Sequence, residues 1–149
     1  MAQLVDFTGY WVEDASATTP YQDVLAAQGM SFILRQLSKL VTIAFDMKHE
    51  LEPVDKLVVV DLQNQTDVYL FDGVERIETH PWWGQMHTRN YRDENGNGVT
   101  HARDINGKWS SVTIWSLEDE GNTHIQLVTF KSKTVNKELK LVYRKKVKK

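Results

Sequence analysis

The stretch that decides the fold runs from Val99 to Lys146 and reads VTHARDINGKWSSVTIWSLEDEGNTHIQLVTFKSKTVNKELKLVYRKK. Turn-forming residues interrupt it at Asn106-Gly107 and at Glu120-Gly121-Asn122. The segments between these turns are rich in β-branched and aromatic residues, which favour strands. Their regular spacing predicts an antiparallel meander, with strands over residues 99–105, 109–117, 123–131 and 137–146.

The same pattern extends towards the N-terminus. Val41, Ile43, Phe45 and Met47 occupy alternate positions, as expected for a strand with one buried face. We count one strand before two short helices, over residues 7–13, and nine strands after them. Because an open meander would leave two long edges exposed, closure into a barrel is expected. We therefore predict an all-β fold, a ten-stranded antiparallel up-and-down β-barrel that forms a single domain over residues 1–149.

Two short helices are predicted between the first two strands, where they would form a lid over one open end of the barrel. Thr19-Pro20-Tyr21-Gln22 has the form of a capping box with proline at the first helical position. Gly29 separates this helix from a second one, on which Met30, Ile33 and Leu37 form an apolar stripe. We expect Met30 and Ile33 to contact a ligand beneath the lid.

The composition is that of a globular domain and excludes several kinds of chemistry. The chain has 149 residues, of which 41% are hydrophobic and 26% are charged, and it has no cysteine. Disulfides, thiolate metal sites and cysteine nucleophiles are therefore excluded. We expect no signal peptide at its start, and no apolar segment reaches the roughly 20 residues that span a bilayer. We expect a cytoplasmic monomer that does not bind nucleic acid.

The sequence contains few candidates for catalysis or metal binding. None of its five histidines follows the spacing of a metal-binding motif. Ser110 and Ser111 lack the G-x-S-x-G context of a nucleophile elbow. We therefore expect neither a metal nor a cofactor.

Several motifs resemble those of the intracellular lipid-binding proteins, which include the fatty-acid-binding and cellular retinoid-binding proteins. Phe7-Thr8-Gly9-Tyr10-Trp11 matches the family's opening F-x-G-x-W, and residues 29–36 resemble its G-x-x-F-x-x-R-Q pattern on the second helix. Residues 73–79 and 101–107 resemble its G-V-E-F-D-E-T and H-L-Q-K-W-D-G segments. The motifs extend in order over nearly the whole chain. The resemblance implies a carrier with a fatty acid, a retinoid or another lipid inside the barrel.

The sequence departs from this family at the residues that bind a lipid carboxylate. Many members use an Arg-x-Tyr pair on the last strand and a further arginine on the eighth. Here the pair is Leu141 and Tyr143, and the eighth-strand position falls on Ile114 or on Trp115, depending on the end from which it is counted. The usual carboxylate clamp is therefore absent, and these four residues are candidates for contact with the ligand.

Alternation along a strand predicts which side chains share the inward face. On the last strand, Leu141 and Tyr143 are expected to face the lumen. On the seventh strand, the resemblance implies that His101 and Arg103 face inward. A buried arginine needs a partner, so Arg103 is a candidate for a relocated anion clamp. The alternative is that Arg103 faces solvent or pairs with a strand carboxylate such as Asp61.

Two further segments are candidates for contact with a ligand or a membrane. In His80-Pro81-Trp82-Trp83-Gly84, one indole is expected to line the cavity or its mouth, or else to pack in the core. On the second helix, Phe32 and Lys39 lie away from the apolar stripe. They would contact an anionic membrane transiently during ligand transfer, or form a solvated face.

The sequence favours a carrier that binds and transports a hydrophobic small molecule. The alternative is an enzyme in the same cavity, namely an isomerase, a cyclase or a cofactor-free oxygenase. His101, Arg103 and Tyr143 would then act as acid, base or oxyanion-binding groups. A third alternative is an interaction module whose interior is filled by side chains.

Overall fold

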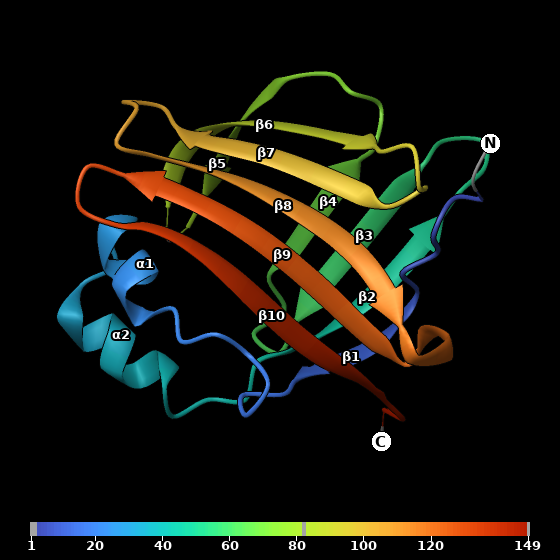
Figure 1. The fold of residues 1–149 in the computed structure, drawn as a ribbon, viewed down its shortest axis with the longest axis horizontal. Helices are drawn as coiled ribbons and strands as arrows, with labels where there is room; N and C mark the ends of the chain where they lie inside the picture. Colours follow the sequence, from blue (N-terminus) through green and yellow to red (C-terminus); the bar gives the residue numbers. More distant parts are fainter. Residues whose placement is uncertain (1–2, 82, 149) are drawn as a thin grey trace.

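The computed structural model describes residues 3–81 and 83–148, and this part of the chain forms one ten-stranded antiparallel sheet (Figure 1). Consecutive strands are neighbours and the first strand also pairs with the last, in the order β4-β3-β2-β1-β10-β9-β8-β7-β6-β5. The strands are β1 (Gly9–Glu13), β2 (Ala44–Glu50), β3 (Lys56–Asp61), β4 (Thr66–Leu70), β5 (Arg76–His80), β6 (Gly84–Arg92), β7 (Gly98–Asp104), β8 (Trp109–Glu118), β9 (Thr123–Ser132) and β10 (Asn136–Lys146). The predicted all-β up-and-down architecture is confirmed.

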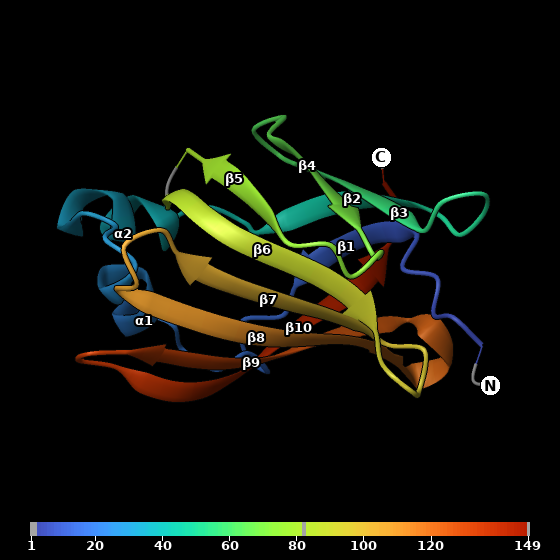
Figure 2. The ribbon, with the colours of Figure 1, turned by 90° about the horizontal axis from the view of Figure 1, so that it is seen from above.

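The sheet curls around a cavity, and its two edge strands, β4 and β5, are not paired with each other. Figure 2 shows these two strands lying apart on one side of the curled sheet. The ladder of backbone hydrogen bonds is therefore open at this position. Between β4 and β5, the lumen is bordered by side chains of these two edge strands and not by backbone hydrogen bonds.

Helices α1 (Gln22–Ala27) and α2 (Phe32–Ser38) connect β1 to β2 at one end of the barrel (Figure 1). Val24 of α1 is buried against Trp109, Phe130 and Leu139 of the sheet. In contrast, α2 contains no buried residue, and Ile33 is 71% exposed. Of the two helices predicted at this end of the barrel, α1 packs into the barrel, and the apolar stripe of α2 is left exposed. Neither of these two helices has the length or apolar character that crossing a bilayer requires.

The start of α1 also differs from the predicted capping box. The helix begins at Gln22 rather than at Pro20, and no side chain forms a capping hydrogen bond at Tyr21. The Thr19 hydroxyl instead accepts a hydrogen bond from the backbone N–H of Lys140 at 3.0 Å. Thr19 therefore secures the segment before the helix to β10, a tertiary contact that overrides the local motif.

The N-terminal segment closes the opposite end of the barrel, where it lies beside the turn between β6 and β7 (Figure 1). The Val5 N–H donates to the Gly96 carbonyl at 3.0 Å. Phe7 is fully buried and stacks on His49, with 5.7 Å between the ring centroids. The buried residues of this aromatic core are Phe7, Trp11, Met47, Leu57, Phe71, Trp115 and Tyr143. The space that remains in the barrel lies between this core and α1.

Candidate ligand-binding cavity

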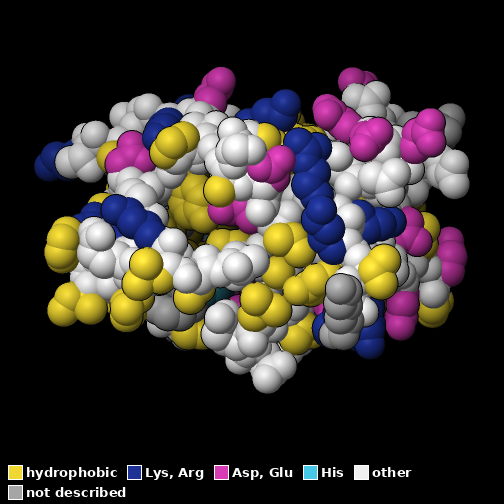
Figure 3. All heavy atoms as spheres, turned by 90° about the horizontal axis from the view of Figure 1, so that it is seen from below, with side chains coloured by type: hydrophobic (Ala, Val, Ile, Leu, Met, Phe, Trp, Pro, Cys, Tyr) yellow, Lys and Arg dark blue, Asp and Glu magenta, His cyan; other side chains and the backbone are white. Residues whose placement is uncertain are grey.

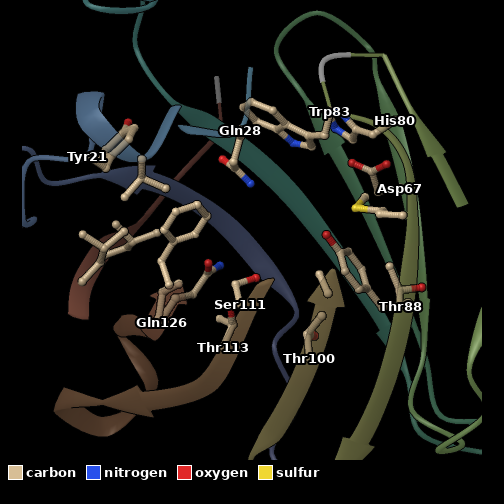
Figure 4. Close-up of a pocket in the computed structure, with 18 of the residues that line it drawn as sticks. Tyr21, Gln28, Asp67, His80, Trp83, Thr88, Thr100, Ser111, Thr113 and Gln126 are labelled. Atoms are coloured by element: carbon tan, nitrogen blue, oxygen red, sulfur yellow. The ribbon is translucent and has the colours of Figure 1, made fainter. Parts of the chain in front are cut away.

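A cavity of about 720 Å³ lies between the aromatic core and α1 (Figure 4). This volume is in the range of pockets that bind small, mostly hydrophobic molecules. The hydroxyl side chains of Thr88, Thr100, Ser111 and Thr113 line one side, from β6, β7 and β8. Apolar side chains such as Val128 line other parts of the wall. The cavity therefore suits a largely apolar molecule with some hydrogen-bonding capacity.

The lumen face of β7 carries Thr100 and Ala102, both of which line the cavity. Arg103 therefore points away from the lumen. Its side chain is 53% exposed, and its Nη1 donates a hydrogen bond to Glu75 Oε1 at 2.6 Å. The predicted inward orientation is therefore wrong. The alternative, that Arg103 faces solvent or pairs with a carboxylate, is confirmed, and the partner is Glu75, just before β5, rather than Asp61. The error is explained by the alignment of this strand with the family's sequences. If the alignment is off by one residue, every side chain of the strand is assigned to the opposite face of the sheet.

His101 lies on the same outer face of β7 as Arg103, so its predicted place in the lumen is also wrong. Its Nε2 lies 3.0 Å from the Tyr91 hydroxyl. Burial and the nearby Arg89 lower the pKa of His101. His101 and Arg103 therefore lie on the outer face of the barrel and Tyr143 lines the cavity, so the three side chains of the alternative enzyme hypothesis do not meet.

On β8, the structure decides between the two candidates for the inward position. Trp115 is 4% exposed and lines the cavity. Ile114 lies on the outer face and is 37% exposed, so its prediction as a lumen residue is wrong. Leu141 and Tyr143 of β10 line the cavity, as alternation predicts. The cavity therefore gathers three of the eight predicted site residues.

Met30 and Ile33 are not among the described residues that line the cavity. Tyr21, Val24 and Gln28, from α1 and its flanks, line it instead. The apolar stripe does lie on a helix, α2, but helical periodicity alone does not determine which neighbour a helix packs against. Met30 and Ile33 therefore lie outside the described lining of this cavity.

Gln126 of β9 lines the cavity and was missed by the sequence reasoning. It lies opposite Trp115 in the β8–β9 register. The signal was present, because Gln126 shares a strand face with the lumen residues Val128 and Phe130. A polar residue inside an apolar alternation is therefore the feature that would have identified it.

His124 holds the Gln126 amide in a fixed orientation. His124 is fully buried, its Nδ1 lies 3.2 Å from the Ser116 carbonyl oxygen, and its Nε2 lies 3.1 Å from Gln126 Nε2. Because a carbonyl can only accept, Nδ1 carries the proton and Nε2 accepts from the amide. Burial lowers the pKa of His124 to about 4, so the ring is neutral near pH 7.

The charges around the cavity are of one sign. No lysine or arginine is found among its described lining residues, whereas the carboxylates of Glu13, Asp67 and Glu78 are. Burial raises the pKa of Glu13, which accepts a hydrogen bond from the Tyr21 hydroxyl at 3.1 Å. Burial, together with Asp67 and Glu78, raises the pKa of Tyr69. These carboxylates, two of which lie on the unpaired edge strands β4 and β5, make the lumen unfavourable for an anion.

Trp83 lines the cavity near its edge (Figure 4). Its ring stacks on His80, with 5.5 Å between centroids and 17° between planes. The prediction that one indole of this segment lines the cavity is therefore confirmed for Trp83, and Trp82 lies outside the described residues. This stacked pair offers a flat apolar surface to a bound molecule.

No protein-family model matches this sequence, and no curated protein matches it. Solved structures do. The apo form of lipid binding protein 8 from Caenorhabditis elegans is 18% identical with a TM-score of 0.75, covering 98% of this chain and 99% of that chain. The Schistosoma mansoni fatty acid binding protein in complex with arachidonic acid is 17% identical with a TM-score of 0.72, covering 95% and 96%. Fatty-acid-binding protein 1 of Echinococcus granulosus is 15% identical with a TM-score of 0.72, covering 95% and 98%. The chain therefore has the fold of the fatty-acid-binding proteins over nearly its whole length.

Proposed function

We propose that this protein binds a hydrophobic small molecule inside its barrel and carries it through the cytoplasm. The observation that carries the proposal is the cavity of about 720 Å³ between α1 and the aromatic core. At about 0.8 kcal/mol per buried methylene, a long acyl chain gains on the order of 10 kcal/mol before the costs of association. The Schistosoma mansoni protein of the same fold is in complex with arachidonic acid, which supports a lipid as the occupant.

Loading and release take place at an anionic membrane, through the exposed face of α2. Phe32, Ile33 and Leu37 are 65%, 71% and 54% exposed. Arg35 and Lys39 lie on or beside the same helix. Figure 3 shows hydrophobic side chains gathered with basic ones at the helical end of the molecule. Bulky apolar residues flanked by cations are typical of helices that rest in the interface of an anionic bilayer.

Titration with Nile red, a neutral hydrophobic dye, tests the cavity. We expect a saturable fluorescence increase with at least micromolar affinity, and displacement of the dye by long-chain lipids. The Thr113→Trp variant places an indole in the lumen and should abolish binding. The Thr129→Trp variant places the same side chain on the exposed face of β9 and serves as the matched control. Absence of saturable binding by the wild type would contradict the proposal.

A further inference from the structure

A groove of about 650 Å³ lies on the outer face of the sheet. Its walls are the turn between β7 and β8 and the turn between β9 and β10, which lie at the helical end of the barrel (Figure 1). Four of its described lining residues are cations, namely Arg103, Lys108, Lys131 and Lys133, and none is an aspartate or a glutamate. The charge of the groove is therefore opposite in sign to that of the carboxylates around the lumen.

Three side chains of the groove form a row across neighbouring strands. Arg103 of β7 is the register partner of Ser110 of β8, and Ser110 is the partner of Lys131 of β9. Register partners project from the same face of a sheet, and neighbouring strands lie about 5 Å apart. Two cations therefore flank a hydroxyl group on the outer face.

The two turns that carry Lys108 and Lys133 are held by hydrogen bonds between side chains and backbone. Asp104 Oδ2 accepts from the Lys108 N–H at 3.1 Å, and Ser132 Oγ accepts from the Val135 N–H at 2.8 Å. The backbone of both turns is therefore ordered before a ligand binds. Binding has to order only the exposed side chains, which lowers its entropic cost.

The cations of the groove are poorly balanced by acidic groups. Lys108, Lys131 and Lys133 form no ion pair with the described residues. Arg103 donates one hydrogen bond, from Nη1 to Glu75, and these two side chains are 53% and 48% exposed. Such surface pairs are weak, and the other N–H groups of the guanidinium remain available to an anion.

We infer that this groove binds a small molecule with several phosphate groups, such as an inositol phosphate, either free or as the head group of a lipid. Arginine and lysine are the side chains that bind phosphate in proteins, arginine through paired N–H donors. A single phosphate cannot neutralise both ends of the row, because Arg103 and Lys131 lie on strands separated by β8. The volume of the groove suits a molecule of this size. The site lies outside the lumen and does not depend on the proposed carrier function.

Isothermal titration calorimetry with soluble inositol trisphosphate, at pH 7 and about 0.15 M salt, tests the inference. We expect saturable binding to one site per chain with micromolar affinity. The Lys131→Gln, Lys133→Gln double variant should weaken this binding at least tenfold. The Lys48→Gln, Lys140→Gln double variant removes the same charge from exposed positions outside the groove and is the matched control. It should change the affinity less than twofold.

A variant that leaves all the cations in place tests the role of Arg103. Glu75→Gln removes the carboxylate that competes for its guanidinium, so it should strengthen binding of inositol trisphosphate at least twofold. Glu50→Gln removes an exposed carboxylate from β2 and is the matched control, with no expected change. Urea unfolding, expected to be nearly unchanged, shows that each variant folds. Equal affinities in the Glu75→Gln variant and the wild type would remove Arg103 from the site and overturn the inference as stated.

Sedimentation with vesicles distinguishes the two sources of this chemistry. Vesicles that contain phosphatidylinositol bisphosphate are compared with phosphatidylserine vesicles of equal surface charge. Stronger binding to the former, reversed by soluble inositol trisphosphate, identifies a lipid head group as the occupant. If inositol trisphosphate binds but the two kinds of vesicle do not differ, the occupant is a free phosphorylated molecule. Absence of saturable binding of inositol trisphosphate, or equal losses in the two lysine double variants, would overturn the inference.

Discussion

The Arg92 guanidinium holds the Asp55 carboxylate by two hydrogen bonds, from Nε to Oδ2 at 2.7 Å and from Nη2 to Oδ1 at 2.9 Å. Both side chains are largely buried, at the barrel end that the N-terminal segment closes. His49 Nε2 also lies 2.7 Å from Asp55 Oδ1. Burial opposes ionisation of Asp55, but the bonds from Arg92 and His49 hold its pKa below the usual value. The pair ties the start of β3 to the end of β6 across the unpaired sheet edges.

The Asp55→Asn substitution should destabilise the protein by about 3 kcal/mol, because it leaves the buried Arg92 cation without its counter-charge. The measurement is urea unfolding at pH 7, compared with the wild type. Asp72→Asn breaks a solvent-exposed bidentate pair with Arg76 and is the matched control, with a much smaller expected loss. Equal losses in the two variants would contradict the structural role of the Asp55–Arg92 pair.

The stabilisation from Asp55 should depend on pH in a defined direction. Because its pKa is lower in the folded state, its contribution is fully present above the unfolded value of about 3.9. It is lost as the pH falls through the folded pKa. The difference in unfolding free energy between wild type and Asp55→Asn should therefore be constant from pH 7 to pH 5 and shrink below pH 4.

Gly96 should tolerate alanine much less well than Gly107. Both adopt a left-handed φ, of 78° and 72°, which costs about 1–2 kcal/mol for any other residue. A Cβ at Gly96 would lie 2.1 Å from the Gln3 carbonyl oxygen, whereas one at Gly107 would meet nothing within 4 Å. Urea unfolding should therefore show an additional loss for Gly96→Ala of roughly 1–3 kcal/mol from the steric conflict. Matching losses would show that the N-terminal segment is not held against this turn.

The buried His124 should make the protein less stable in mild acid. Its pKa of about 4 in the folded state lies below the unfolded value of about 6.5. The unfolded chain therefore binds the proton first, and stability falls as the pH decreases from 6.5 to 4, by roughly 3 kcal/mol from this group. NMR titration should show His124 ionising near pH 4 while the protein is folded. A flatter stability profile for His124→Gln in urea would confirm the assignment, and an identical profile would contradict it.

The exposed side chains of α2 should govern transfer without governing affinity. A Phe32→Ala, Ile33→Ala variant should slow transfer of Nile red to vesicles that contain phosphatidylserine at least threefold. Its equilibrium affinity and stability should change little, because α2 has no buried residue. Val54→Ala, at a 53% exposed residue before β3, is the matched control. Transfer rates equal to those of the wild type would show that α2 is a solvated face.

Arg103→Gln should leave ligand affinity unchanged for both charged and neutral lipids. The reason is the position of Arg103 on the outer surface, paired with Glu75 at 2.6 Å. Displacement of Nile red by hexadecanoate measures the effect. A tenfold loss of hexadecanoate affinity in this variant would place Arg103 back in the binding site and contradict the orientation of β7.

Local chemistry in the sequence determined the architecture of this protein. Turn residues such as Asn106-Gly107 and the alternating β-branched segments between them specify strands and hairpins, because both act over a few neighbouring residues. Alternation also identified Leu141 and Tyr143 as lumen residues. Both properties follow from interactions that are near in sequence.

The tertiary structure decided which side chains meet in the cavity. A single-residue shift in register sends Arg103 outward and leaves Thr100 and Ala102 in the lumen, and two-fold alternation alone cannot set the phase between strands. The spacing of apolar residues in α2 predicts a helix but does not determine what the helix packs against. Ile33 of this stripe is in fact exposed. Gln126 and Trp115 line the cavity side by side because β8 and β9 place them opposite each other. Which side chains face the cavity depends on contacts between elements that are distant in the sequence. Sequence patterns alone therefore do not predict it.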